Sequence, residues 1–188
     1  MLAPAGLSKE EDIFAPVARS SRNRGVWLGV NLVTAFIASW VIGLFEQTIQ
    51  QVVALAVLMP IVASMGGNAG TQTLTLVVRG LAVGTISESN ARRLLSRELM
   101  IGAVNGLVWA LVVAAVAVWW YGNFMIGVLI AAAMVINLGF AALSGVAIPF
   151  AVRRFGADPA LASGVILTTV TDVVGFFAFL GLATLFLI

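Results

Sequence analysis

The sequence predicts an all-α membrane protein with five transmembrane helices. Of its 188 residues, 61% are hydrophobic and only 10% are charged, whereas a soluble domain carries about 25% charged residues. Five apolar runs follow one another along the chain, and each reaches the roughly 20 residues that a helix needs to cross a bilayer. The runs are apolar on nearly every face, unlike the alternating segments of about ten residues in outer-membrane barrels. This composition excludes a soluble globular enzyme.

The first element is a polar segment, residues 1–25, which we expect to be a cytosolic tail or the end of a connecting helix. Between Ser8 and Arg24, a free tail and a helix that leads in from another domain both stay open. No cleaved leader is expected, because these residues are polar. The predicted spans follow at about 26–44, 52–78, 99–120, 124–152 and 160–188.

The basic residues predict the orientation of the spans. They lie before the first span, between the second and third, and between the fourth and fifth: Lys9, Arg19, Arg22, Arg24, Arg79, Arg92, Arg93, Arg97, Arg153 and Arg154. The other connections, residues 45–51 and 121–123, contain no Lys or Arg. The positive-inside rule therefore predicts a multi-pass protein of the cytoplasmic (inner) cell membrane, with a cytoplasmic N-terminus and an extracytoplasmic C-terminus. Because these residues mark one membrane face, the net charge of +2 does not indicate nucleic-acid binding.

The connection before the third span contains a helix-start signal. Thr85 and Glu88 are spaced as a capping box, which predicts a short interfacial helix with basic residues among its apolar ones. We interpret this segment as a solvated connector with basic anchors; the alternative is a gate or a contact to lipid headgroups. Glu88, Glu98 and Asp158 are considered as ligands of an inner-surface metal site, but none is favoured.

Small and amide side chains within the spans predict helix packing. Three glycine pairs have the four-residue spacing that allows close approach of helices in lipid: Gly25 with Gly29, Gly66 with Gly70, and Gly102 with Gly106. Asn31, Asn105 and Asn137 are interpreted as interhelical hydrogen-bond donors, and Pro149 is expected to kink the fourth span.

Asp172 is the only acidic residue deep within a predicted span. A carboxylate at the bilayer centre costs about 2.5–3.5 kcal/mol even on the lenient insertion scale, and no Lys or Arg lies within a span to pair with it. One interpretation is a protonated Asp172 that bonds to a neighbouring Asn, Gln or Thr. The favoured one is a carboxylate that faces a water-filled path and meets a cation, with Thr168 and Gly175 on the same side of the helix.

The second span contains a stretch of helix-weakening and polar residues. Pro60 removes a backbone donor and three glycines follow closely, so we expect a kink or an unwound turn. Irregular backbone at membrane depth is tolerated only where protein buries it or water lines it. The candidate pathway residues of this stretch are Gly66, Gly67, Asn68, Thr71 and Gln72. The alternative is close packing on the glycines, with Asn68 and Gln72 bonding across helices.

The available ligand atoms restrict the metal. The chain has no cysteine and no histidine, which excludes thiolate and imidazole sites, and oxygen ligands favour Mg²⁺, Ca²⁺ or Mn²⁺. One carboxylate per chain provides few ligands and little charge for a cation, whereas a homodimer would bring two Asp172 side chains together. Mg²⁺ gives up its waters reluctantly, so a sparse ring of carboxylates and amides suits the hydrated ion. No catalytic residues are predicted.

The two motifs resemble the transmembrane domain of the MgtE magnesium channels. They are Pro60 with Gly66-Gly67-Asn68-Ala69-Gly70-Thr71-Gln72, and Thr168-Thr169-Val170-Thr171-Asp172-Val173-Val174-Gly175-Phe176-Phe177. The resemblance covers about residues 13–188. It implies a homodimeric Mg²⁺-selective channel with a central pore lined by the second and fifth spans, in which Asp172 of both subunits holds hydrated Mg²⁺. It also implies that Asn68 and Gln72 line the pore and that carbonyls near Thr168 contact the ion's water shell.

The resemblance also implies a missing regulatory part. Full-length family members carry a cytosolic N domain and paired CBS domains ahead of this segment, and Ser8–Arg24 resembles the end of their connecting helix. We therefore predict no closure through those domains for this sequence. Two alternatives to a passive channel are a proton- or Na⁺-coupled secondary divalent-cation transporter, and a membrane scaffold in which Asp172 only fixes dimer register.

Overall fold

The computed structural model describes residues 16–188 and is entirely helical in its regular structure within that range. Its helices are α1 (Val17–Gly43), α2 (Glu46–Gln51), α3 (Ala54–Val83), α4 (Glu88–Tyr121), α5 (Phe124–Arg154) and α6 (Pro159–Leu187). All but the short α2 are long and apolar enough to cross a membrane, which gives five candidate spans. The predicted all-α membrane fold is confirmed. Within Ser8–Arg24, Pro16 precedes α1 and residues 17–24 belong to it, whereas residues 8–15 lie outside the described part of the chain.

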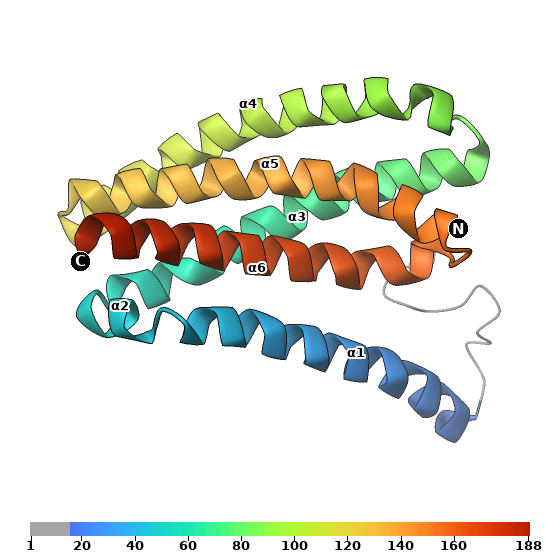
Figure 1. Ribbon diagram of the computed structural model, residues 1–188, viewed down its shortest axis with the longest axis horizontal. Helices are drawn as coiled ribbons and strands as arrows, with labels where there is room; N and C mark the ends of the chain where they lie inside the picture. Colours follow the sequence, from blue (N-terminus) through green and yellow to red (C-terminus); the bar gives the residue numbers. More distant parts are fainter. Residues whose placement is uncertain (1–15) are drawn as a thin grey trace.

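Helix α5 lies at the centre of the bundle. It packs against α3, α4 and α6, whereas α1 packs mainly on α6 and stands to one side of the bundle (Figure 1). Small residues allow this central position: a Cβ at Gly102 of α4 would lie 3.0 Å from the Cβ of Ala142 in α5. Packing is thereby confirmed for two of the three glycine pairs, those that begin at Gly66 and Gly102. Gly25 and Gly29 in α1 have no atom of another described element within 4 Å of an added Cβ, so within residues 16–188 that prediction is wrong.

The predicted interfacial helix is not separate from the third span. Helix α4 runs unbroken from Glu88 to Tyr121, because no proline or glycine interrupts it at the membrane surface. Its start also differs from the prediction: the backbone N–H of Ser87 donates to Oδ1 of Asn90 at 3.0 Å. The capping pair is therefore Ser87 with Asn90 rather than Thr85 with Glu88.

Helix α3 is likewise continuous, which corrects the prediction of an unwound turn. Pro60 and the glycines at 66, 67 and 70 all lie inside the helix Ala54–Val83. Pro60 sits in the second turn, where its missing N–H removes one helical hydrogen bond. Unwinding further residues would leave more backbone groups unsatisfied within the membrane. Pro149 lies inside α5 without ending that helix.

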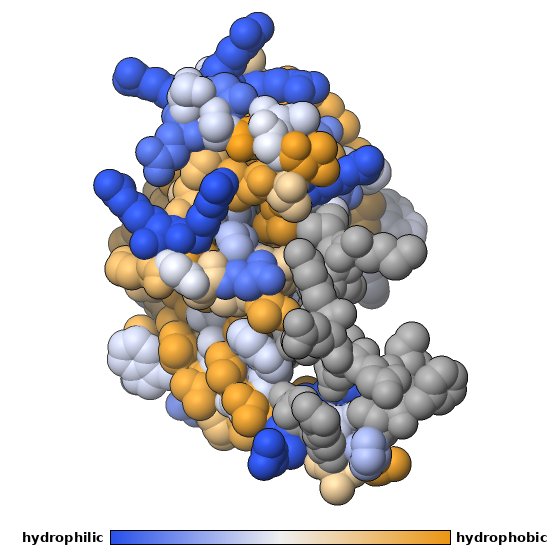
Figure 2. Space-filling view, turned by 90° about the vertical axis from the view of Figure 1, so that its right-hand side faces the viewer, coloured by the Kyte–Doolittle hydropathy of each residue, from blue (hydrophilic) through white to orange (hydrophobic). Residues whose placement is uncertain are grey.

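The connections alternate between the two ends of the bundle. The α3–α4 and α5–α6 connections and the start of α1 lie at one end, and the α4–α5 connection and the C-terminus lie at the other (Figure 1). Hydrophilic side chains gather at the first end (Figure 2), where the exposed basic residues of these elements include Arg79, Arg92, Arg93, Arg153 and Arg154. A bundle with one basic end is the arrangement that the positive-inside rule requires.

Candidate functional site

Asp172 lies half-buried in the middle of α6. Asp158 is the N-cap of this helix: its Oδ1 accepts a hydrogen bond from the backbone N–H of Ala160 at 2.9 Å, and Pro159 lies in the first turn. Among residues 16–188, no hydrogen bond or ion pair is formed by the Asp172 carboxylate. The adjacent Thr171 hydroxyl donates to the Thr168 carbonyl at 3.0 Å instead. The structure therefore lacks the neighbouring partner that a purely structural, protonated Asp172 would need.

Thr168 lies one turn before Asp172 and is exposed. Its hydroxyl donates to the carbonyls of Gly164 at 3.2 Å and Val165 at 3.1 Å, both within α6. A hydroxyl has one hydrogen and two acceptor lone pairs. Thr168 therefore keeps acceptor capacity beside Asp172, which suits a cation or its water shell.

A stripe of exposed polar side chains runs along one face of α3. Its members are Ser64, Asn68, Thr71, Gln72 and Thr75, and their spacing of three or four residues places them on one side of a helix. We call this set the α3 polar stripe. Asn68 donates to the Ser64 hydroxyl at 3.3 Å within the same helix. Among residues 16–188 it does not form the cross-helix bond that the packing alternative required. Five polar side chains on the open face of an apolar helix are unfavourable against lipid.

Contacts between α3 and α6 place the polar stripe at the depth of Asp172. A Cβ at Gly70 would lie 2.9 Å from Cδ1 of Leu167, and a Cβ at Gly175 would lie 3.2 Å from Cγ1 of Val62. The two helices therefore run antiparallel here, with Leu167 beside Gly70 and Gly175 beside Val62. Asp172 lies between these contacts along α6. The α3 residue opposite Asp172 is therefore about Met65. Ser64 of the polar stripe lies at that level, and Asn68 lies about one helical turn away.

The predicted pathway residues separate into two groups. Asn68, Thr71, Gln72 and Thr168 are exposed, and Gly67 and Asp172 are half-buried. Gly66 and Gly175, in contrast, are buried on the side of α3 and α6 that faces Asn137 of α5. Because side chains of the chain itself fill the space next to these two glycines, we leave both out of the pathway proposed below.

Asn137 of α5 contacts both α3 and α6. Its side chain is 0% exposed, its Nδ2 donates to the carbonyl of Val62 at 2.8 Å, and it lies against Gly66 and Gly175. Its Oδ1 is buried without a hydrogen-bond partner within the described chain. The predicted interhelical bond is confirmed for Asn137. Asn31 and Asn105 are exposed instead. What the sequence did not indicate is that Asn137 holds both helices of the candidate site.

Glu98 is a second acidic residue in a protected position. It is buried, and its Oε2 accepts a hydrogen bond from Thr73 of α3 at 3.0 Å. Thr73 in turn lies against α5, where a Cβ at Gly145 would be 2.8 Å from the Thr73 Cβ. Glu98 thus ties α4 to α3 rather than facing the membrane surface. Across residues 16–188 no group of three or more His, Cys, Asp and Glu side chains converges on a metal position.

The geometry implies a particular kind of ligand. Asp172, Thr168 and the α3 polar stripe offer oxygen atoms, which suit hard cations. One chain supplies too few ligands to surround a bare ion. These few ligands can bind a hydrated cation through its water molecules, or they can form half of a site that two chains share.

Comparison with known proteins identifies similar sequences along most of the chain. The sequence model of the MgtE family, described as a divalent cation transporter, matches residues 59–182. The magnesium transporter MgtE of Bacillus subtilis is 36% identical over 161 residues, which are 86% of this chain and 36% of that protein. The Thermus thermophilus MgtE is 33% identical over 161 residues, with the same two shares. The Enterococcus faecalis MgtE is 33% identical over 183 residues, which are 97% of this chain and 40% of that protein. The chain thus spans well under half the length of these relatives.

Proposed function

Because the chain belongs to the MgtE family of divalent cation transporters, we propose that it is a Mg²⁺ channel. In this proposal, hydrated Mg²⁺ crosses the cytoplasmic membrane down its electrochemical gradient, along a path lined by the α3 polar stripe and by Thr168 and Asp172 of α6. The relatives named above are magnesium transporters. No covalent bond is formed or broken in this process, so no enzymatic chemistry is involved.

The α3 polar stripe is the single observation that carries the proposal. Its side chains are exposed on the described chain, yet α3 is long and apolar enough to span the membrane. Polar side chains in spans face a bundle interior or a water-filled cavity rather than lipid. The stripe passes the depth of Asp172, which supports an aqueous path shared by α3 and α6.

A homodimer completes the path. If two copies face each other across α3 and α6, the two polar stripes enclose one central pore and two Asp172 carboxylates meet there. The two carboxylates together balance the charge of one divalent cation, and the bound cation relieves the repulsion between the carboxylates. Closed two-fold assemblies are the commonest oligomers, and each copy covers the polar face of the other.

The sparse ligand set favours hydrated Mg²⁺ over a dehydrated ion. Mg²⁺ requires six ligands in octahedral geometry and holds its waters tightly. Carboxylate, amide and hydroxyl oxygens can bind those waters through hydrogen bonds without replacing them. The membrane potential then drives entry, at about 4.6 kcal/mol per 100 mV for a doubly charged ion.

Mg²⁺ uptake into sealed proteoliposomes tests this function. The protein is reconstituted, an inside-negative potential is imposed, and internal Mg²⁺ is followed with an entrapped dye, with protein-free vesicles as the control. We expect uptake that increases with the potential and stays unchanged when proton and Na⁺ gradients are removed. Uptake that requires a proton or Na⁺ gradient would identify a coupled transporter. Vesicles with protein that behave like empty ones would favour a scaffold.

A further inference from the structure

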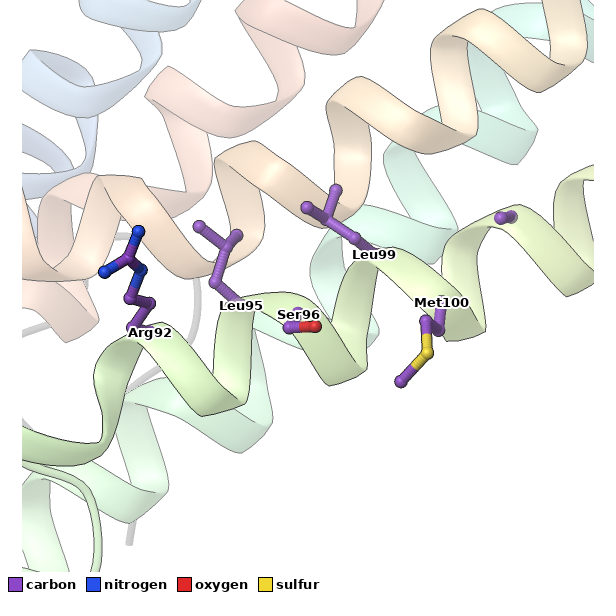
Figure 3. Close-up of a pocket in the computed structure, with 6 residues that line it drawn as sticks. Arg92, Leu95, Ser96, Leu99 and Met100 are labelled. Atoms are coloured by element: carbon purple, nitrogen blue, oxygen red, sulfur yellow. The ribbon is translucent and has the colours of Figure 1, made fainter.

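A shallow groove, mostly open to its surroundings, lies on the outer face of α4. It has a volume of about 440 Å³ and is lined by Arg92, Leu95, Ser96, Leu99, Met100 and Ala103 (Figure 3). Arg92 stands at one end, and the side chains beyond Ser96 are apolar. The lining residues repeat every three or four positions, so the groove follows one side of the helix.

The groove has the length of one membrane leaflet. From Arg92 to Ala103 the helix rises about 16 Å, at 1.5 Å per residue. Half of a hydrocarbon core is about 15 Å thick. Arg92 lies at the basic end of the bundle. A phospholipid whose headgroup lies at Arg92 would therefore have an acyl chain that reaches about as far as Ala103.

The charged end of the groove suits a phosphate. Arg92 is exposed, and no carboxylate pairs with it among residues 16–188. Ser96 lies one turn further along the same face and adds a hydroxyl donor. A guanidinium binds phosphate through parallel N–H groups, and basic pockets on the cytoplasmic side of membrane helices bind acidic headgroups.

The helix behind the groove is anchored. Glu98 lies between the lining residues Ser96 and Leu99 in sequence but points to the interior, where Thr73 of α3 donates to it. A little further along, Gly102 packs closely on Ala142 of α5. These contacts fix the rotation of α4, so that the lining side chains stay on its outer face.

We propose that this groove binds one anionic phospholipid of the cytoplasmic leaflet. Arg92 and Ser96 bind its phosphate, and one acyl chain lies along Leu99, Met100 and Ala103. Anionic lipid is the occupant because the cytoplasmic leaflet carries negative charge and the polar end of the groove is cationic. This site is independent of the ion path, since it lies on a different helix and a different face.

Lipid binding to the delipidated protein in detergent tests the proposal. Native mass spectrometry measures binding of phosphatidylglycerol and of phosphatidylcholine with the same acyl chains. We expect phosphatidylglycerol to bind more tightly at one site, and Arg92→Gln to weaken it about fivefold, because one basic side chain near the surface contributes about 1 kcal/mol. Arg93→Gln is the matched control: it removes the same charge at the same depth, but Arg93 does not line the groove. It should change the affinity less than twofold.

A second variant tests the apolar part of the site. Met100→Trp fills the groove without changing the charge, and Met100 is 62% exposed, so the fold tolerates the substitution. We expect weaker binding of both lipids. Equal effects of Arg92→Gln and Arg93→Gln, or equal affinity for the two headgroups, would overturn the proposal. Competition by millimolar inorganic phosphate would indicate a free-anion site instead. Dissociation of a dimer by Met100→Trp with unchanged lipid binding would assign the groove to a second copy.

Discussion

Asp172→Asn is expected to lower Mg²⁺ uptake at least tenfold in the proteoliposome assay. In the proposed dimer the substitution removes two negative charges from the path. A hydrogen bond to a charged group is worth about 1.5–3 kcal/mol, so losing two such groups exceeds the 1.4 kcal/mol that corresponds to a factor of ten. Asparagine keeps the shape and removes the cost of holding a charge at membrane depth, so the folded bundle should be retained.

Asp158→Asn is the matched control for this prediction. Asp158 caps the start of α6 at the exposed end of the helix, and asparagine is an equally good N-cap residue. The same change of charge on the same helix should therefore leave uptake unchanged. Undiminished uptake in Asp172→Asn, with protein incorporation equal to the wild type, would make Asp172 a structural residue.

Gly66→Ala is expected to destabilise the bundle by about 1–3 kcal/mol, a typical cost of inserting a methyl group into a packed site. An added Cβ would overlap Nδ2 of Asn137 and lie 2.7 Å from its Cγ. Asn137 is 0% exposed and lies in close contact with Gly66 on α3 and Gly175 on α6. The substitution would therefore break its hydrogen bond to the Val62 carbonyl and separate α3 from α5.

The neighbouring glycine supplies the control. A Cβ at Gly67 meets nothing within 4 Å, and alanine is favoured over glycine within a helix by about 0.5–1 kcal/mol. Thermal unfolding in detergent should therefore give a lower Tm for Gly66→Ala and an equal or higher Tm for Gly67→Ala. Equal Tm values for the two variants would show that the Asn137 junction does not hold the helices together.

Two of the helix starts carry a local signal in the sequence. Asn123 caps α5 by accepting the N–H of Met125 at 2.9 Å, and Asp158 with Pro159 starts α6. The start of α4 was predicted wrongly because two overlapping patterns compete there. Thr85 with Glu88 matches the sequence rule, but the pair that forms is Ser87 with Asn90.

The contacts between helices could not be predicted from the sequence. Helices that are apolar on every face carry no periodic signal to indicate which side is buried, and this holds for α5 and α6. The bond from Asn137 to Val62 joins residues 75 positions apart, and the bond from Thr73 to Glu98 joins residues 25 positions apart. The same limit explains why the sequence did not indicate that Gly66 and Gly175, both expected along the pathway, lie against Asn137 of α5.

Cysteine modification tests most directly whether α3 and α6 line the ion pathway. The chain contains no cysteine, so a single introduced thiol is the only reactive one. Thr71→Cys and Thr168→Cys place thiols on the two proposed walls, and Leu111→Cys places one on the outer face of α4, where Leu111 is 70% exposed. A positively charged thiosulfonate reagent is added to proteoliposomes during Mg²⁺ uptake at a fixed potential. We expect the reagent to block uptake by both threonine variants, more slowly when Mg²⁺ is raised, and to leave Leu111→Cys unaffected. Uptake that continues unchanged through modified Thr71→Cys and Thr168→Cys would contradict a pathway between these helices.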